Sequence, residues 1–159
     1  MIRIGIISDT HGLLRPEATA ALQGSDYLIH AGDICDPAIL EQLRAIAPLT
    51  VVRGNNDKGA WADSINETEF LRVGEIFIYV IHDIAQLAID PAAAGVHAVV
   101  AGHSHKPRVD ERDGVLFVNP GSAGPRRFSL PISVAEIIVD GASLAARIVA
   151  LEVAKPAKR

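Results

Sequence analysis

Side chains that can bind metal ions recur along the chain, each directly after an apolar run. Asp9 and His11 follow the run that begins at Ile4, and one residue separates them. Imidazole and carboxylate groups, with one amide oxygen, are ligands for Mn²⁺, Fe, Ni²⁺, Co²⁺ or Zn²⁺. These ligands outnumber what one open catalytic ion needs, so they suit two ions that share a carboxylate. The candidate ligands are Asp9, His11, Asp33, Asn55, His82, His103 and His105.

The apolar runs before these ligands predict the strands that position them. The runs are short and rich in β-branched residues, which is typical of buried strands. Helical patterns over 16–22 and 37–47 separate the first three runs, and this alternation predicts right-handed parallel crossovers. Because the carboxyl ends of parallel strands converge on one edge of a sheet, ligands distant in sequence can meet there. The first run begins at residue 4, and the others span 26–31, 49–53, 75–81 and 96–101.

The remaining segments predict antiparallel pairs, one more helix and a surface loop. Two β-rich runs joined at Gly74 favour a hairpin, and the Asp113-Gly114 pair favours another. Pro91 is expected to bend or break the last helix. The expected elements are hairpins over 67–81 and 108–118, a helix over 84–94, a loop over 58–64 and paired strands over 132–139 and 143–152. We expect one domain over 1–154 and a frayed tail over 155–159.

Size and charge limit the classes of partner. The chain has 159 residues, of which 49% are hydrophobic, so we expect one domain with a packed core. The formal net charge is −4, and no basic stripe of the kind that follows a nucleic-acid backbone is present in the sequence. This composition argues against duplex nucleic acid as a partner, although a cyclic or short nucleotide stays compatible with it.

The cysteine count and the hydropathy pattern indicate a compartment. Cys35 is the single cysteine, which excludes an intramolecular disulfide and a thiolate metal site, and we expect it to pack as a small apolar residue. The N-terminus enters the first strand without a signal-peptide pattern. No apolar run approaches the roughly 18 residues of a membrane span. We therefore expect a cytoplasmic protein with no membrane partner.

The order of the motifs resembles that of a known family. Asp9-Thr10-His11, Gly32-Asp33, Gly54-Asn55, His82 and Gly102-His103-Ser104-His105 occur in the order of the calcineurin-like metallophosphoesterase superfamily. The short chain and the late Asn119-Pro120-Gly121-Ser122 look like its compact bacterial and archaeal phosphodiesterase branch. The similarity runs from Ile4 to about residues 122–127. It implies an α/β fold in which two mixed β-sheets pack as a sandwich flanked by helices.

The resemblance also implies how the ligands divide between two ions. One ion would take Asp9, His11, Asp33 and His105, and the other Asp33, Asn55, His82 and His103, with Asp33 bridging. Two ions roughly 3.5–4 Å apart lower the pKa of a bridging water, so the expected nucleophile is a metal-bridging hydroxide. We expect two divalent transition-metal ions, Mn²⁺ first, with Ni, Fe, Co or Zn as alternatives. The expected catalytic residues are Asp33, Asn55, Asn56 and His11.

The sequence is compatible with two roles for each of several residues. Arg126 and Arg127 are surface charges by default, and each could instead contact a substrate phosphate together with Asn56. The Asn119–Ser122 segment is either a turn after a strand or a loop near the phosphate. His30 is expected to be a hydrogen-bonded core residue or a residue that supports a ligand, and His97 a structural or exposed residue.

Two positions depart from the pattern that this chain resembles. Many relatives carry histidine where this chain has Asn56, and that histidine is thought to protonate the leaving oxygen. Because an amide is not a useful acid at neutral pH, we expect better activity on esters with acidic leaving groups, such as aryl oxides. Asp83 stands where relatives commonly show glycine, and it could tighten the turn, support a ligand or crowd the second ion.

The expected function is metal-dependent hydrolysis of small phosphoesters, with a nucleotide-like compound as one candidate substrate. The alternative is a scaffold or binding module, because eukaryotic proteins similar to this branch use the same fold for assembly with an eroded site. The complete ligand set in this sequence favours the enzyme. The apolar hairpin over 70–81 and the terminal strands could form a homo-oligomer interface.

Overall fold

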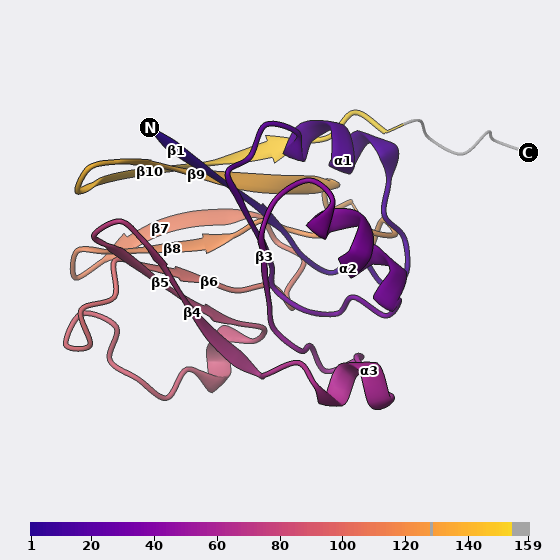
Figure 1. Ribbon diagram of the computed structural model, residues 1–159, viewed down its shortest axis with the longest axis horizontal. Coiled ribbons are helices and arrows are strands. Elements are labelled where there is room, and N and C mark those ends of the chain that lie inside the picture. The colour runs from indigo at the N-terminus through magenta and orange to yellow at the C-terminus, as the bar shows by residue number, and fades with distance from the viewer. Residues whose placement is uncertain (128, 154–159) are drawn as a thin grey trace, which may run out of the picture.

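Two five-stranded sheets form the body of the molecule (Figure 1). The computed structural model describes residues 1–127 and 129–153. The strand order is β10-β9-β1-β2-β3 in the first sheet and β4-β5-β6-β8-β7 in the second. Both sheets are mixed, and side chains of both share one hydrophobic core cluster. The two-sheet sandwich implied by the resemblance is therefore confirmed.

The first sheet contains the predicted parallel crossovers. β1 pairs in parallel with β2, and β2 with β3, while β9 lies antiparallel to β1 and pairs with β10. Pro37 stands in the first turn of α2, and the Asp36 carboxylate accepts a hydrogen bond from the Ala38 N–H there. The elements are β1 (Ile2–Ile7), α1 (Pro16–Leu22), β2 (Tyr27–His30), α2 (Pro37–Arg44), β3 (Leu49–Val51), β9 (Ser133–Asp140) and β10 (Ser143–Ala150).

The second sheet combines two hairpins with a central parallel strand. β4 pairs with β5 and β7 with β8 in antiparallel register, as predicted for both hairpins. β6 lies between β5 and β8 and is parallel to both, so the ends of β5 and β6 point the same way. The elements are β4 (Thr68–Val73), β5 (Ile76–Ile81), β6 (Ala98–Val100), β7 (Arg108–Arg112) and β8 (Val115–Asn119).

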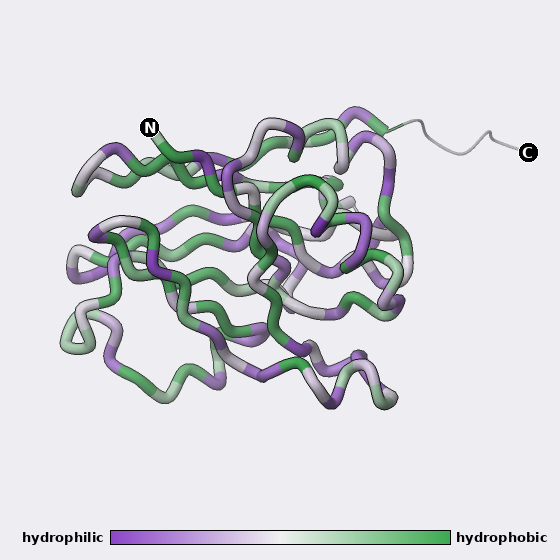
Figure 2. The backbone as a smooth tube through the Cα atoms, viewed as in Figure 1, coloured by the Kyte–Doolittle hydropathy of each residue, from purple (hydrophilic) through white to green (hydrophobic). Residues whose placement is uncertain are grey.

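Alternation along the strands divides the apolar side chains between the layers. Ile4 and Ile6 of β1 belong to the core cluster between the sheets, together with Ile78 of β5. Ile7 belongs instead to the cluster that contains Leu22 of α1 and residues of α2, so these helices cover the outer face of the first sheet. Green hydrophobic residues recur along the strands in Figure 2. This packing positions the strands whose ends carry the candidate ligands.

Two predictions of local structure are wrong. Residues 84–94 form only the 3-10 helix η1 (Ile84–Gln86) followed by turns, because Leu87 and Ile89 pack on the outer face of the second sheet and Pro91 offers no N–H to a helix. Residues 58–64 contain the one-turn helix α3 (Ala60–Asp63), since Ala62 is buried and its N–H donates to the Gly59 carbonyl.

Three further observations concern limits of the predicted segments. α2 ends at Arg44, three residues earlier than predicted, and the chain continues as a turn. The predicted tail over 155–159, and the end of the predicted domain at residue 154, lie outside the described residues. Within the part of the chain that the structure describes, no helix combines the length and hydrophobicity needed to span a membrane.

Candidate metal centre

The loops after β1, β2, β3, β5 and β6 meet at one edge of the sandwich. The Asp9 N–H donates to the Gly32 carbonyl at 3.0 Å, which joins the loop after β1 to the loop after β2. The Gly102 N–H donates to the His82 carbonyl at 2.9 Å, which joins the loops after β6 and β5. Backbone hydrogen bonds thus join four of the loops that carry candidate ligands in two pairs.

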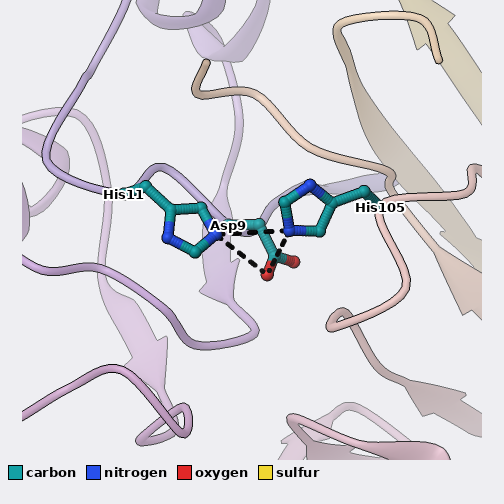
Figure 3. Close-up of side chains that lie close together, drawn as sticks. All are labelled: Asp9, His11 and His105. Atoms are coloured by element: carbon teal, nitrogen blue, oxygen red, sulfur yellow. Dashed lines mark hydrogen bonds and ion pairs between the residues drawn. The ribbon is translucent and has the colours of Figure 1, made fainter. Parts of the chain in front are cut away.

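Three of these ligands, Asp9, His11 and His105, form a tight cluster (Figure 3). The Nε2 atoms of His105 and His11 lie 3.3 Å and 3.7 Å from Asp9 Oδ1, and 3.2 Å from each other. Ligand atoms that bind one ion at about 2.1 Å lie about 3.0–3.4 Å apart. Two of the three distances fall within this range, and the third, from His11 Nε2 to Asp9 Oδ1, is 3.7 Å, so a small movement of His11 would give the spacing of ligands around a single cation.

The Asp9 carboxylate shows most directly that the cluster fits a cation. Asp9 is completely buried, and its Oδ2 accepts hydrogen bonds from Ser8 Oγ at 2.6 Å and from the His103 N–H at 3.1 Å. Its Oδ1 has no hydrogen-bond partner among the described residues. A buried carboxylate oxygen without a partner is strongly unfavourable unless a cation compensates it, so the donor set fits a metal ion.

Asp33 joins this cluster to the remaining ligands. Its Oδ2 lies 3.7 Å from His11 Nε2 and 3.4 Å from His82 Nε2. Asn55 Oδ1 lies 2.9 Å from His82 Nε2 and 3.2 Å from His103 Nδ1. Ligand atoms of Asp9, Asp33 and His82 also lie within 4.8 Å of one another. One carboxylate therefore faces ligands of both expected ions.

Three of the histidines also have a neighbour at the ring nitrogen that faces away from the cluster. His82 Nδ1 donates to the Ala31 carbonyl at 2.6 Å, which directs Nε2 toward the cluster. His103 Nε2 lies 3.8 Å from Asp83 Oδ2, and His11 Nδ1 lies 3.9 Å from the Cys35 sulfur. Asp83 also caps η1 by accepting a hydrogen bond from the Ala85 N–H. Asp83 thus both tightens its turn and faces a candidate ligand.

Burial and charge set the protonation of the cluster. Burial acts to raise the pKa of Asp33, but hydrogen bonds from His82 and Asn56 outweigh it, so the pKa lies well below its ordinary value. Burial lowers the pKa of His11 against the opposing charges of Asp33 and Asp9, and the charge of Arg127 lowers it further. Burial acts to lower the pKa of His82, but its hydrogen bonds to Asp33 and Ala31 outweigh burial, so that pKa is raised. Metal binding requires neutral imidazoles, so an ion would have to displace any proton from His82 Nε2.

Most of the candidate ligands have an unusual backbone conformation. Five of them have left-handed φ values between 46° and 69°, a region that residues other than glycine rarely adopt. Such residues are destabilising by about 1–3 kcal/mol each and persist where the surrounding structure holds them. They are Asp9, His11, Asp33, His103 and His105.

Asp57 supports this arrangement, and its role was not predicted from the sequence. Its buried carboxylate accepts hydrogen bonds from the backbone N–H groups of Asp33, Ile34, Cys35 and Gly54, at 2.8–3.0 Å. These bonds fasten the loop after β2 to the loop after β3. A Cβ atom at Gly54 would lie 2.2 Å from Asp33 N, so only glycine allows this approach. The sequence feature that could have indicated this supporting role is the acidic residue two positions after Asn55.

Side chains of the late Asn119–Ser122 segment donate hydrogen bonds to the ligand loops. Asn119 Nδ2 donates to the Gly102 carbonyl at 3.0 Å and to Ser104 Oγ at 3.1 Å. Ser122 Oγ donates to the Asp9 carbonyl at 2.9 Å. These contacts position the loops after β6 and β1, which adds a supporting role to the two interpretations of this segment.

The expected substrate-binding residues differ in their distance from the cluster. Asn56 is exposed, and its Nδ2 donates to Asp33 Oδ2 at 3.0 Å. Arg127 is near enough for its charge to affect His11, whereas no hydrogen bond or ion pair of the described residues joins Arg126 to the cluster. Arg53 pairs with Glu67 at 2.9 Å.

The structure also shows the environments of His30, His97 and Cys35, for which the sequence predicted supporting or packing roles. His30 is fully buried and hydrogen-bonded to the ligand loops, and His97 is exposed, with its Nδ1 accepting from the Phe77 N–H. The prediction that Cys35 packs as an apolar residue is wrong, because Cys35 is exposed. Partial burial of its sulfur, with the charge of Asp57, raises the pKa of the thiol to about 11.

Comparison with known proteins agrees with these motifs. The family model of the calcineurin-like phosphoesterase superfamily domain matches residues 2–141. A probable metallophosphoesterase of Methanothermobacter thermautotrophicus is 35% identical over 157 residues, covering 92% of this chain and 91% of that protein. A phosphodiesterase of Methanocaldococcus jannaschii is 28% identical and covers 76% of this chain and 83% of its own length.

Solved structures support the fold. An archaeal phosphodiesterase has a TM-score of 0.76 at 20% identity, covering 93% of this chain and 100% of that chain. Vacuolar Protein Sorting 29 from Cryptosporidium parvum has a TM-score of 0.73 at 22% identity, covering 94% of this chain and 98% of that chain. With the family model matching most of its length, the chain belongs to the calcineurin-like phosphoesterase superfamily.

Proposed function

We propose that this protein is a phosphodiesterase that depends on two divalent metal ions and hydrolyses small phosphoesters. The observation that carries the proposal is the position of Asp33. Its Oδ2 lies 3.7 Å from His11 Nε2 in one ligand cluster and 3.4 Å from His82 Nε2 in the other. A carboxylate shared by two sets of ligands is the arrangement that a dinuclear hydrolase needs.

The protein side chains would hold the ions and the substrate in fixed positions. Asp9, His11 and His105 would hold one ion, Asn55, His82 and His103 the other, and Asp33 both. When bound, two such ions make a water more acidic and neutralise phosphoryl charge. The Asn56 amide would orient the substrate, and solvent would protonate the leaving oxygen, so acidic leaving groups would react faster. Arg127 would add positive charge for the phosphoryl oxygens.

The intact donor set supports catalysis over the alternative scaffold role. A protein that only binds partners does not need buried carboxylates with unpaired oxygens, and Asp9 Oδ1 is one such atom. The names of the archaeal relatives, a probable metallophosphoesterase and a phosphodiesterase, point in the same direction.

Hydrolysis of bis-4-nitrophenyl phosphate tests the proposal. The reaction is measured with added Mn²⁺ or Ni²⁺, with EDTA, and in the Asp33→Ala variant. We expect release of 4-nitrophenolate that requires metal and falls at least 100-fold in Asp33→Ala. Glu41→Ala, an exposed change on α2, is the matched control and retains the rate. Activity that neither EDTA nor Asp33→Ala reduces would remove the enzymatic interpretation.

Finer features stay predictions from the sequence. They are Mn²⁺ as the native ion, a nucleotide-like substrate, a cytoplasmic location, one domain over 1–154 and association into homo-oligomers. Metal analysis of protein purified without added ions checks the first, and light scattering checks the last.

A further inference from the structure

A groove lies directly beside the ligands expected for the second ion. Asn55, His82 and His103 line its inner end, and its volume is about 450 Å³. Small-molecule sites occupy roughly 300–1,000 Å³, so the groove has room for an organic group next to the metal centre. Its walls come from the loop after β3, from the outer face of β4 and β5, and from the turn after β5.

The groove walls carry hydrogen-bonding groups beside an aromatic ring. Tyr79 is only 6% exposed and lines the groove, yet its hydroxyl makes no hydrogen bond to any described residue. Thr68 and Gln86 also line the groove. A hydroxyl without a protein partner is available to a ligand with polar edges, which would satisfy it. An alkyl chain would leave these groups unpaired.

The charges of the groove select against a second phosphate. Arg53 is its one arginine, and the Arg53 guanidinium already pairs with the Glu67 carboxylate at 2.9 Å. Asp83 adds a further carboxylate, 3.8 Å from His103 Nε2. The fixed charges of these three side chains sum to −1, so the groove favours an uncharged group over an anionic one.

We propose that this groove binds the uncharged, ring-bearing ester group of the substrate, of nucleoside size, while the phosphoryl group lies at the metal centre. The proposal rests on the proposed function, and it names the substrate class as phosphodiesters of nucleosides or similar polar ring compounds. Tyr79, Thr68 and Gln86 would recognise the ring group. Asp83 and Glu67 would exclude additional phosphates.

Equilibrium binding tests the groove without any need for turnover. Methyl phosphate, thymidine 5′-phosphate and thymidine 3′,5′-bisphosphate are titrated calorimetrically into Mn²⁺-loaded protein. We expect thymidine 5′-phosphate to bind at least tenfold more tightly than methyl phosphate. The bisphosphate, whose extra charge would enter the groove, is expected to bind no more tightly than thymidine 5′-phosphate.

A variant that fills the groove tests ligand binding in the groove independently of phosphate binding at the metal centre. Ala88 is exposed and lines the groove, so Ala88→Trp should abolish the advantage of thymidine 5′-phosphate and leave methyl phosphate binding unchanged. Ala94→Trp, in the same segment but not lining the groove, is the matched control and keeps the advantage.

The outcomes distinguish this proposal from the proposed function. Equal affinities for methyl phosphate and thymidine 5′-phosphate, or an Ala88→Trp variant that behaves like Ala94→Trp, would overturn the groove proposal alone. Absence of metal-dependent hydrolysis of bis-4-nitrophenyl phosphate would overturn the proposed function, and the binding differences would still be measurable.

Discussion

The Asp57 carboxylate accepts a hydrogen bond from the backbone N–H of Asp33 at 3.0 Å. Asp33 has a left-handed φ of 57°, and its own carboxylate faces both ligand clusters. Because the Asp57 carboxylate also accepts from three other backbone N–H groups, it holds the Asp33 loop in this unfavourable conformation. A residue that is not itself a candidate ligand therefore determines where the shared carboxylate lies.

Replacing Asp57 with asparagine should damage both stability and the metal centre. The new side-chain amide would offer one oxygen and direct an N–H₂ group at backbone donors, which leaves buried N–H groups unpaired. We expect Asp57→Asn to lower the free energy of unfolding by about 2–4 kcal/mol and to weaken Mn²⁺ binding. Urea denaturation of metal-free protein measures the first effect, and calorimetric titration with Mn²⁺ measures the second.

The matched control for this variant is Asp36→Asn, which makes the same chemical change at the start of α2. The Asp36 carboxylate accepts one exposed hydrogen bond, and asparagine caps helices about as well as aspartate, so stability should change by less than about 0.5 kcal/mol. If Asp57→Asn is no more destabilising than Asp36→Asn, Asp57 does not hold the loop.

Much of the fold could be predicted because the candidate ligands closely follow apolar runs that form strands. β1, β2, β5 and β6 lie in short apolar runs, and Asp9, Asp33, His82 and His103 follow them within a few residues. The parallel topology then places their ends at one edge. The helix expected over 84–94 was wrong because tertiary packing of Leu87 and Ile89 overrides a weak local preference.

The supporting contacts could not be predicted in the same way. A hydrogen bond from Ser122 to the Asp9 carbonyl joins residues far apart in the sequence, and no spacing rule indicates it. The groups around Asp57 are backbone N–H groups, which every residue except proline carries, so only their shared conformation creates the site. Motifs thus identified the candidate ligands, while the atoms that orient them depended on the folded loops.

His30 should make the metal-free protein less stable in acid. The Gly32 N–H donates to His30 Nδ1, so the neutral ring donates from Nε2 to Thr10 Oγ1, whose hydroxyl donates to the Ile34 carbonyl. Complete burial is the main reason that the pKa of His30 is lowered to about 4. An unfolded histidine has a pKa near 6.5, so the unfolded state binds more protons between these values.

The sign of this effect follows from that difference. His30 adds no penalty above pH 6.5, and the free energy of unfolding should fall as the pH drops from about 6.5 to 4, by up to about 3 kcal/mol. Urea denaturation in EDTA at pH 7.5, 5.5 and 4.5 measures the slope. His30→Asn, which cannot take up a proton, should be less stable at pH 7.5 but show a shallower slope. Parallel slopes for the two proteins would exclude His30 as the cause.

Metal ions should raise the thermal stability of the wild-type protein. Bound cations would compensate the buried Asp9 and Asp33 carboxylates, and the unfolded chain offers no assembled site. An ion present at 100 times its Kd stabilises the folded state by about 2.7 kcal/mol, which corresponds to about 5–10 °C in Tm for a chain of this size. Differential scanning calorimetry with and without Mn²⁺ measures the shift.

The control for the metal effect is a variant that keeps the fold but loses the shared carboxylate. Asp33→Asn should show at most half of the wild-type shift, because both ligand clusters depend on Asp33. Glu41→Ala should retain the full shift. A rise in Tm of equal size in Asp33→Asn would mean that Mn²⁺ binds elsewhere.

Asn56→His should extend the activity to esters with basic leaving groups. The Asn56 amide is exposed and donates to Asp33 Oδ2, so an imidazole can occupy this position and also release a proton near neutral pH. General acid catalysis typically contributes 10²–10⁴-fold, so we expect at least a tenfold increase on a dinucleoside phosphate, whose leaving group is an alkoxide. The rate on bis-4-nitrophenyl phosphate should change less than threefold, because 4-nitrophenolate leaves without a proton.

Asn66→His, on the exposed segment before β4, is the control for this variant and should change neither rate. A gain on the dinucleoside phosphate should also decline above the pKa of the new imidazole, since only its protonated form is an acid. Equal changes on both substrates, or a gain that does not depend on pH, would show that residue 56 does not act on the leaving oxygen.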